Sequence, residues 1–106
     1  MLFYKESIRM KRESQFQSNL IKDLKKIFPG CFVLKNDSSY CQGIPDLLVL
    51  YKDHWAMLEC KRYSKATHRP NQDYYIKKFG EMSYANFVSP ENKEEVLNEL
   101  QQAFQS

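Results

Sequence analysis

Apolar residues recur at helical spacing in two parts of this 106-residue chain. Between about residues 14 and 28 they fall at intervals of three and four, which is typical of one buried helix face. Pro29-Gly30 would end that helix. Near the C-terminus a similar stripe follows Ser89-Pro90-Glu91, which reads as an N-cap, a first-position proline and a first-turn acid. The two stripes consist of Phe16, Leu20, Leu24, Ile27 and Phe28, and of Val96, Leu97, Leu100 and Phe104.

Shorter apolar runs predict four strands, at residues 31–35, 44–51, 54–61 and 84–88. Polar loops are expected at 36–43 and 62–70, and a further helix at 71–79 that Gly80 closes. The order is then αβββαβα within one domain covering residues 1–106, since this length supports one core. We expect an α/β fold, a mixed sheet flanked by helices, in which the third and fourth strands run parallel.

A two-residue hairpin loop at Lys52-Asp53 would fix how the second and third strands pair. Tyr51 would then face His54, and every pair of opposed positions would sum to 105. Asp46 and Glu59 obey this rule, so we expect them side by side on one sheet face, with Cβ atoms roughly 4.5–5.5 Å apart. A slip of one residue would separate them.

Two directly opposed carboxylates repel each other unless something compensates their charge. A magnesium ion would do so, because it prefers oxygen ligands and is commonly held by one or two carboxylates. Lys61 lies two positions beyond Glu59 and shares its face, so its ammonium is a candidate to orient water or stabilise a phosphate. The Cys60 side chain should point the other way, with its carbonyl as a candidate further metal ligand. The alternative to a metal site is an ordinary strand end at which the acidic and basic side chains are exposed to solvent.

Two residues outside the strands are weaker candidates for the same site. Glu13 shares a helix face with Phe16, Leu20 and Leu24, so its carboxylate either lies at a fraying helix start or is directed at a metal. Gln72 begins the 71–79 helix and either faces the site or lies on the surface.

The distribution of charge and the number of cysteines indicate the kind of binding partner and the cellular location. The net charge of +3 divides into +5 over residues 1–35, −3 over 36–60, +4 over 61–88 and −3 beyond. An acidic centre between basic segments suits a metal site beside a polyanion, although an uneven solvated surface would look the same. Three cysteines without a C-x-x-C pair, no long apolar run and no signal-peptide core predict a cytoplasmic protein without a membrane span.

Pro45-Asp46 followed by Glu59-Cys60-Lys61 resembles the PD-(D/E)xK nuclease superfamily. Together with Glu13, Gly43-Ile44 and Gln72, these motifs are similar to VRR-NUC domains and small Holliday-junction resolvases. The resemblance implies a restriction-endonuclease-like core and a Mg²⁺-dependent DNA endonuclease, with Mn²⁺ as a substitute, possessing Asp46 and Glu59 as metal ligands and Lys61 as the catalytic lysine. It also implies Glu13 as an auxiliary ligand or acid, Gln72 as a supporting residue, and a homodimer acting on branched DNA. The 62–70 loop lacks the Leu-Ser-Pro-Gln phrase often found before that glutamine.

Two other functions compete with hydrolysis. A non-catalytic nucleic-acid-binding module would use basic residues, with Tyr63, Tyr74 and Tyr75 stacking on bases. The acid pair argues against it, because binding alone needs no carboxylates. A zinc site built from Cys31, Cys41, Cys60, His54 and His68 matches no usual ligand spacing. Under either nucleic-acid interpretation, the expected DNA contacts are Lys35, Arg62, Lys65, His68 and Arg69.

Overall fold

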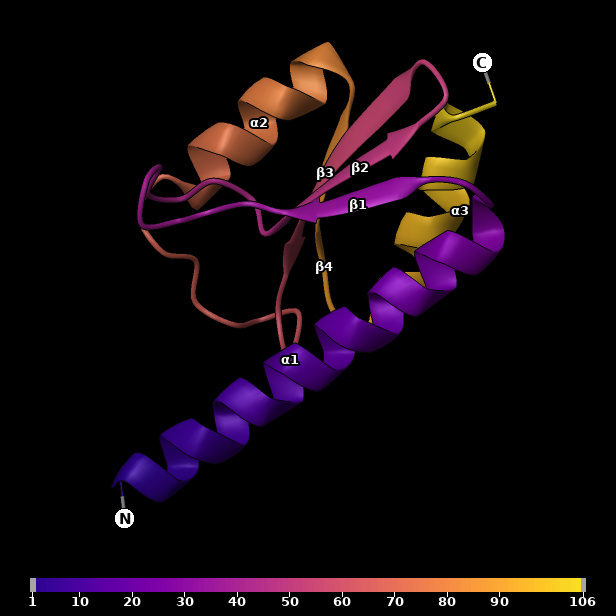
Figure 1. Cartoon of the computed structure of the whole chain (residues 1–106). Coiled ribbons are helices and arrows are strands. Elements are labelled where there is room, and N and C mark those ends of the chain that lie inside the picture. The colour runs from indigo at the N-terminus through magenta and orange to yellow at the C-terminus, as the bar shows by residue number, and fades with distance from the viewer. Residues whose placement is uncertain (1, 106) are drawn as a thin grey trace.

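The structure, a computed structural model, describes the backbone of residues 2–105 and the side chains of residues 12–105. Its order is the expected αβββαβα (Figure 1). The elements are α1 (Leu2–Ile27), β1 (Phe32–Lys35), β2 (Leu47–Tyr51), β3 (His54–Cys60), α2 (Gln72–Met82), β4 (Tyr84–Val88) and α3 (Lys93–Ala103). None of the described helices combines the length and the apolar character needed to cross a membrane.

The four strands form one sheet in the order β1-β2-β3-β4. β1 and β3 each pair antiparallel with β2, whereas β4 pairs parallel with β3 after the α2 crossover. Tyr51 lies opposite His54 and Leu47 opposite Leu58. The predicted mixed sheet and the 105 register are therefore confirmed.

Helices cover the two sheet faces differently. Leu20 and Leu24 of α1 and Leu100 of α3 are fully buried in one core cluster that also contains Leu58 of β3. Both helices therefore pack on the face of Leu58, and Lys93 of α3 forms an ion pair with Asp23 of α1. α2 packs on the other face, where Phe79 meets the Trp55 ring edge-on with ring centroids 6.0 Å apart, as is typical of aromatic pairs.

Several predicted boundaries were wrong. α1 begins at Leu2 and not near residue 14, because good helix formers without Gly or Pro continue the helix past the end of the apolar stripe. β2 begins at Leu47, three positions after the predicted start, because residues 41–44 form a turn in which Gly43 has a φ of +90°. Two other strand limits differ by one residue, with β1 starting at Phe32 and β3 ending at Cys60, whereas β4 spans residues 84–88 as predicted.

The predictions that Gly80 ends the second helix and that Ser89 caps the last helix were also wrong. Gly80 lies inside α2, which continues to Met82 before the Ser83 N–H bonds to the Phe79 carbonyl. Ser89 does not cap α3, which begins at Lys93. Instead the Ser89 N–H donates to Asn92 Oδ1 at 2.8 Å, so residues 89–92 form a turn that precedes the helix and includes Pro90 and Glu91.

Leu58→Ala tests the central position of β3. Its side chain is fully buried between the flanking helices, so we expect a loss of about 2–5 kcal/mol in the free energy of unfolding, measured by urea denaturation. Met82→Ala, at a residue that is 69% exposed, should change it by less than about 0.5 kcal/mol. Equal losses for both variants would contradict this account of the core.

Candidate metal and phosphate site

Asp46 and Glu59 lie next to each other just beyond the last pair of the β2–β3 ladder. The Asp46 N–H donates to Glu59 Oε1 at 3.2 Å, and the Cys60 N–H donates to Asp46 Oδ2 at 2.9 Å. The two carboxyl groups therefore belong to one hydrogen-bonded unit that joins the end of β3 to the start of β2. This is the arrangement that the 105 register predicts.

Gln72 connects the second carboxyl group to the lysine. Its Nε2 donates to Glu59 Oε2 at 3.1 Å, and its Oε1 accepts from Lys61 Nζ at 2.7 Å. Lys61 Nζ also donates to the Thr67 carbonyl at 3.2 Å and lies 4.0 Å from Glu59 Oε2. Gln72 is buried at the first turn of α2, so the structure gives it the site-facing position and not the surface one.

The position of Gln72 is itself fixed by the preceding loop. Its Oε1 accepts a second bond, from the Arg69 N–H at 2.8 Å, and the Gln72 N–H donates to the Arg69 carbonyl. The 62–70 loop lacks the Leu-Ser-Pro-Gln phrase, but it nevertheless positions Gln72 next to Lys61. One amide thus orients a cation and a carboxyl group together.

Burial controls the protonation of the acid pair. Glu59 is 5% exposed, and burial, followed by the adjacent Asp46 charge, raises its pKa from 4.5 to about 8. Burial also raises the pKa of Asp46, against the opposing effect of the Cys60 N–H hydrogen bond. Without a compensating cation, the protein therefore favours a protonated carboxyl group at this position near neutral pH.

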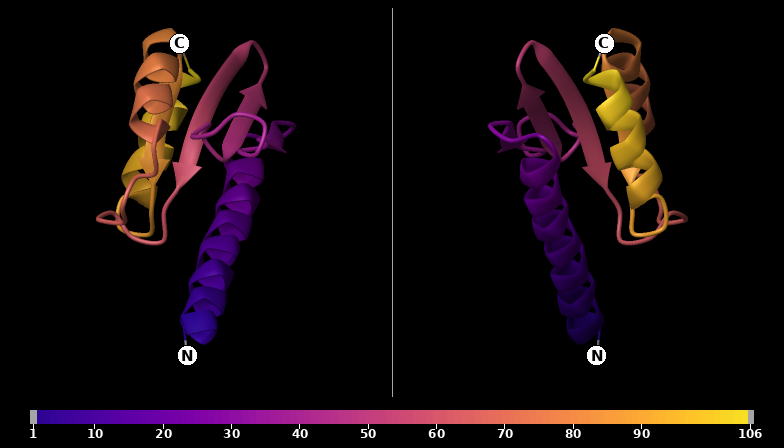
Figure 2. Two further views of the ribbon diagram at one scale, coloured as in Figure 1. Left: turned by 90° about the vertical axis from the view of Figure 1, so that its left-hand side faces the viewer. Right: turned by 90° about the vertical axis from the view of Figure 1, so that its right-hand side faces the viewer.

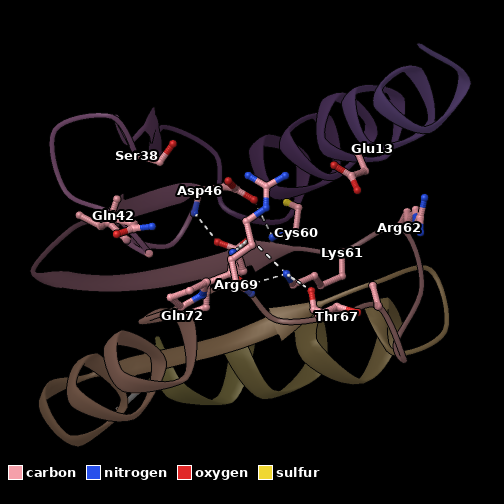
Figure 3. Close-up of a pocket in the computed structure, with 15 residues that line it drawn as sticks. Glu13, Ser38, Gln42, Asp46, Cys60, Lys61, Arg62, Thr67, Arg69 and Gln72 are labelled. Carbon is pink, nitrogen blue, oxygen red and sulfur yellow. Dashed lines mark hydrogen bonds and ion pairs between the residues drawn. The ribbon is translucent and has the colours of Figure 1, made fainter. Parts of the chain in front are cut away.

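These groups form the floor of an open cavity of about 590 Å³ (Figure 3). One wall is the loop before β2 and the other is the loop before α2, while Glu13 of α1 directs its carboxylate toward the cavity from the rim. Arg69 extends across the cavity toward Asp46, whose charged form it favours. The lining residues are Glu13, Ser38, Gln42, Gly43, Ile44, Asp46, Glu59, Cys60, Lys61, Arg62, Ala66, Thr67, Arg69, Pro70 and Gln72.

The predicted nucleic-acid contacts separate into two groups. Arg62 and Arg69 line the cavity, whereas Lys35 and Lys65 are exposed outside its lining. His68 is already engaged: its ring stacks on Phe87 with centroids 4.0 Å apart, and its Nδ1 lies 2.7 Å from an Asp73 carboxylate oxygen. His68 therefore supports the cavity wall in this structure.

The donor set fits a hard divalent cation. Asp46 and Glu59 present carboxylate oxygens, and among residues 12–105 no three His, Cys, Asp or Glu side chains converge on one point. Further ligands would then be carbonyls, waters or substrate oxygens, as is usual for magnesium. The Cys60 side chain belongs to the core cluster, and burial raises the pKa of its thiol, so only its backbone carbonyl stays a candidate.

Three participants were missed by sequence reasoning. Thr67 contributes a backbone carbonyl, for which no side-chain signal exists. Phe87 lies opposite Glu59 in the parallel β3–β4 register, and its ring centroid is 5.9 Å from Lys61 Nζ. Asn71 adopts a left-handed φ of 72° immediately before α2 and donates to the Gln42 carbonyl at 3.4 Å. Only the register of β4 could have revealed Phe87.

Comparisons with protein-family models, curated proteins and solved structures gave no match to this chain. The nuclease resemblance of its motifs therefore stays a prediction, and the geometry above carries the functional argument alone.

Gly43→Ala tests how the two walls are joined. A Cβ at Gly43 would lie 2.6 Å from Asn71 Cβ and 2.8 Å from the Pro70 carbonyl oxygen. We expect it to push the start of α2, and with it Gln72, away from Asp46. Urea denaturation should show a destabilisation clearly larger than that of a matched control.

Gly30→Ala is that control, because Gly30 has nearly the same φ of +89° but nothing within 4 Å of the added Cβ. It should show only the backbone strain, about 1–2 kcal/mol. Equal losses for the two variants would mean that the close approach at Gly43 has no effect.

The raised pKa of Glu59 predicts a pH-dependent stability in the presence of a chelator. The folded protein retains a proton that the unfolded chain releases between its ordinary pKa of 4.5 and about 8, so stability should fall as pH rises through that window. In Glu59→Gln this loss should shrink markedly, as thermal unfolding at pH 5 and 8 would show.

Asp53→Asn is the matched control, since the Asp53 side chain on the hairpin loop is 91% exposed. It should retain the wild-type decrease in Tm. A Glu59→Gln protein with the same pH dependence as the wild type would contradict the assigned cause.

Proposed function

We propose that this protein is a metal-dependent nuclease that hydrolyses DNA phosphodiester bonds. The observation that carries the proposal is a hydrogen-bonded unit at the floor of an open cavity, in which half-buried Asp46 joins the buried residues Glu59, Lys61 and Gln72. A buried acid and a buried ammonium linked by one amide, beside a second, half-buried acid, are costly to assemble for stability alone. Their joint exposure to a single cavity favours a role in chemistry.

The acid pair favours catalysis over simple DNA binding. Carboxylates at a phosphate-binding surface repel the substrate, so a binding module has no use for them at the cavity floor. With Mg²⁺ or Mn²⁺ held by Asp46 and Glu59, the repulsion becomes attraction. When bound there, the cation would neutralise charge on a phosphate and lower the pKa of water.

Lys61 is restrained in a way that suits phosphate recognition. Two of its three ammonium protons are directed to Gln72 and the Thr67 carbonyl. The third proton remains for a substrate oxygen or a water molecule in the cavity. Gln72 thereby holds Lys61 and Glu59 in one fixed geometry before substrate arrives, and such preorganisation is the main source of electrostatic catalysis.

The surroundings of the floor fit a polyanionic substrate. Arg62 and Arg69 line the cavity together with Lys61, and basic side chains bind phosphates by releasing counterions. Glu13 at the rim would assist the metal site. We further propose that the protein selects branched DNA and acts as a homodimer. We also propose that it is located in the cytoplasm, where its three cysteines stay reduced.

A cleavage assay tests it. Plasmid, linear duplex, single-stranded and four-way-junction DNA are incubated with Mg²⁺, Mn²⁺ or EDTA. We expect metal-dependent cleavage that Asp46→Asn, Glu59→Gln and Lys61→Met each reduce by roughly 10²-fold or more. Asp53→Asn removes an exposed carboxylate from the same hairpin and should leave the rate unchanged.

Cleavage by Asp46→Asn at the wild-type rate would refute the site. DNA binding without cleavage under any metal would refute the nuclease and favour the non-catalytic module.

A further inference from the structure

The sheet face that carries Asp46 and Glu59 also carries two apolar rows. The register aligns Leu34 with Leu48 and Met57, and Phe32 with Leu50 and Trp55. Because side chains alternate along a strand, positions 46, 48 and 50 of the second strand share one face. The candidate site is thus the third row of a surface whose other rows are apolar.

Helix α2 covers only part of this surface. It packs on β3 and β4, where Phe79 meets Trp55, and both α2 and α3 stand toward the β4 side of the sheet (Figure 2). On β1, Phe32 is 68% and Leu34 is 47% exposed, while Leu48 and Leu50 of β2 are half-buried. We call Phe32, Leu34, Leu48 and Leu50 the open face. It bears no charge and so offers nothing to a nucleic-acid backbone.

The backbone of β1 is open as well, because β1 is an edge strand. The Asn36 N–H donates to the Asp46 carbonyl at 2.9 Å, so position 36 bonds toward β2. Bonding positions alternate in an antiparallel pair, which directs the N–H and C=O groups of Val33 and Lys35 away from β2. Apart from its shortness and Lys35 at its end, β1 has none of the usual protections of an edge strand against pairing.

We propose that two copies of this chain pair antiparallel through β1, about a two-fold axis at Val33. Val33 of one copy would exchange both backbone hydrogen bonds with Val33 of the other. Phe32 of each copy would then lie opposite Leu34 of the other, at the close spacing of a non-hydrogen-bonded pair. In this register each residue of the segment meets a suitable partner from the identical segment of the other copy. A second copy can therefore pair with this edge through the same residues on both sides, as a two-fold interface requires.

The pairing stands without the nuclease assignment, but its consequence rests on that proposed function. A two-fold axis perpendicular to the sheet keeps both open faces on one side of a continuous eight-stranded sheet. Both candidate sites would then face the same side. Strand spacing and residue rise place them roughly 30 Å apart, ignoring twist. One DNA molecule lying across that side would meet both sites.

Sedimentation velocity without DNA or metal tests the interface across a wide range of protein concentration. The wild type should sediment with twice the mass of the chain. Val33→Pro removes an N–H that points away from β2, so it should block pairing while leaving the β1–β2 ladder intact. Leu34→Lys places like charges near the axis and should also weaken dimerisation, by roughly tenfold or more in Kd.

Met82→Lys, the same change at an exposed residue of α2, should leave the dimer unchanged, and circular dichroism verifies that each variant is folded. A monomeric wild type, an assembly larger than a dimer, or an unaltered dimer in Val33→Pro would each overturn the proposal. An inactive dimer would sink only the nuclease function, whereas an active monomer would sink only this interface.

Discussion

The repulsion between two carboxyl groups on neighbouring strands is the constraint on which this structure depends. Asp46 and Glu59 meet where the β2–β3 ladder ends, and each accepts a backbone N–H from the other strand. Burial raises the pKa of both, and the adjacent Asp46 charge raises that of Glu59 further. A protein selected only for stability would replace one of them, because two opposed acids cost free energy that apolar neighbours do not. The proposed bound cation turns this cost into a binding site.

The remaining elements place groups around that pair. β3, an inner strand of the sheet, carries Glu59 and is followed directly by Lys61, and its Leu58 anchors the strand in the core. The α2 crossover brings Gln72 back over the same face, and its amide joins Lys61 to Glu59. The close approach of Gly43 to Asn71 holds the start of β2 against the start of α2. Three chain segments far apart in sequence thus converge on one polar cluster.

Periodicity and register predicted most of this arrangement, because both are local. The tight connection between Tyr51 and His54 determines the β2–β3 pairing, and with it the contact between Asp46 and Glu59. The boundaries that failed depend on tertiary contacts: Ser89 serves a turn with Asn92, and Gly80 continues a helix that leads directly into β4. Gln72 was only a weak candidate, because its role depends on the course of the loop before it. The carbonyl of Thr67 had no signal at all, since every residue carries one.

Isothermal titration calorimetry with Mn²⁺ tests the central claim most directly, since it measures the cation site without relying on cleavage. At pH 7 the wild type should bind Mn²⁺ with release of a proton, because Glu59 with a pKa of about 8 must lose its proton to become a ligand. Buffers of different ionisation enthalpy reveal that proton, and Asp46→Asn should abolish the binding. Wild-type protein that binds no Mn²⁺, or Asp46→Asn that binds it as the wild type does, would contradict the account.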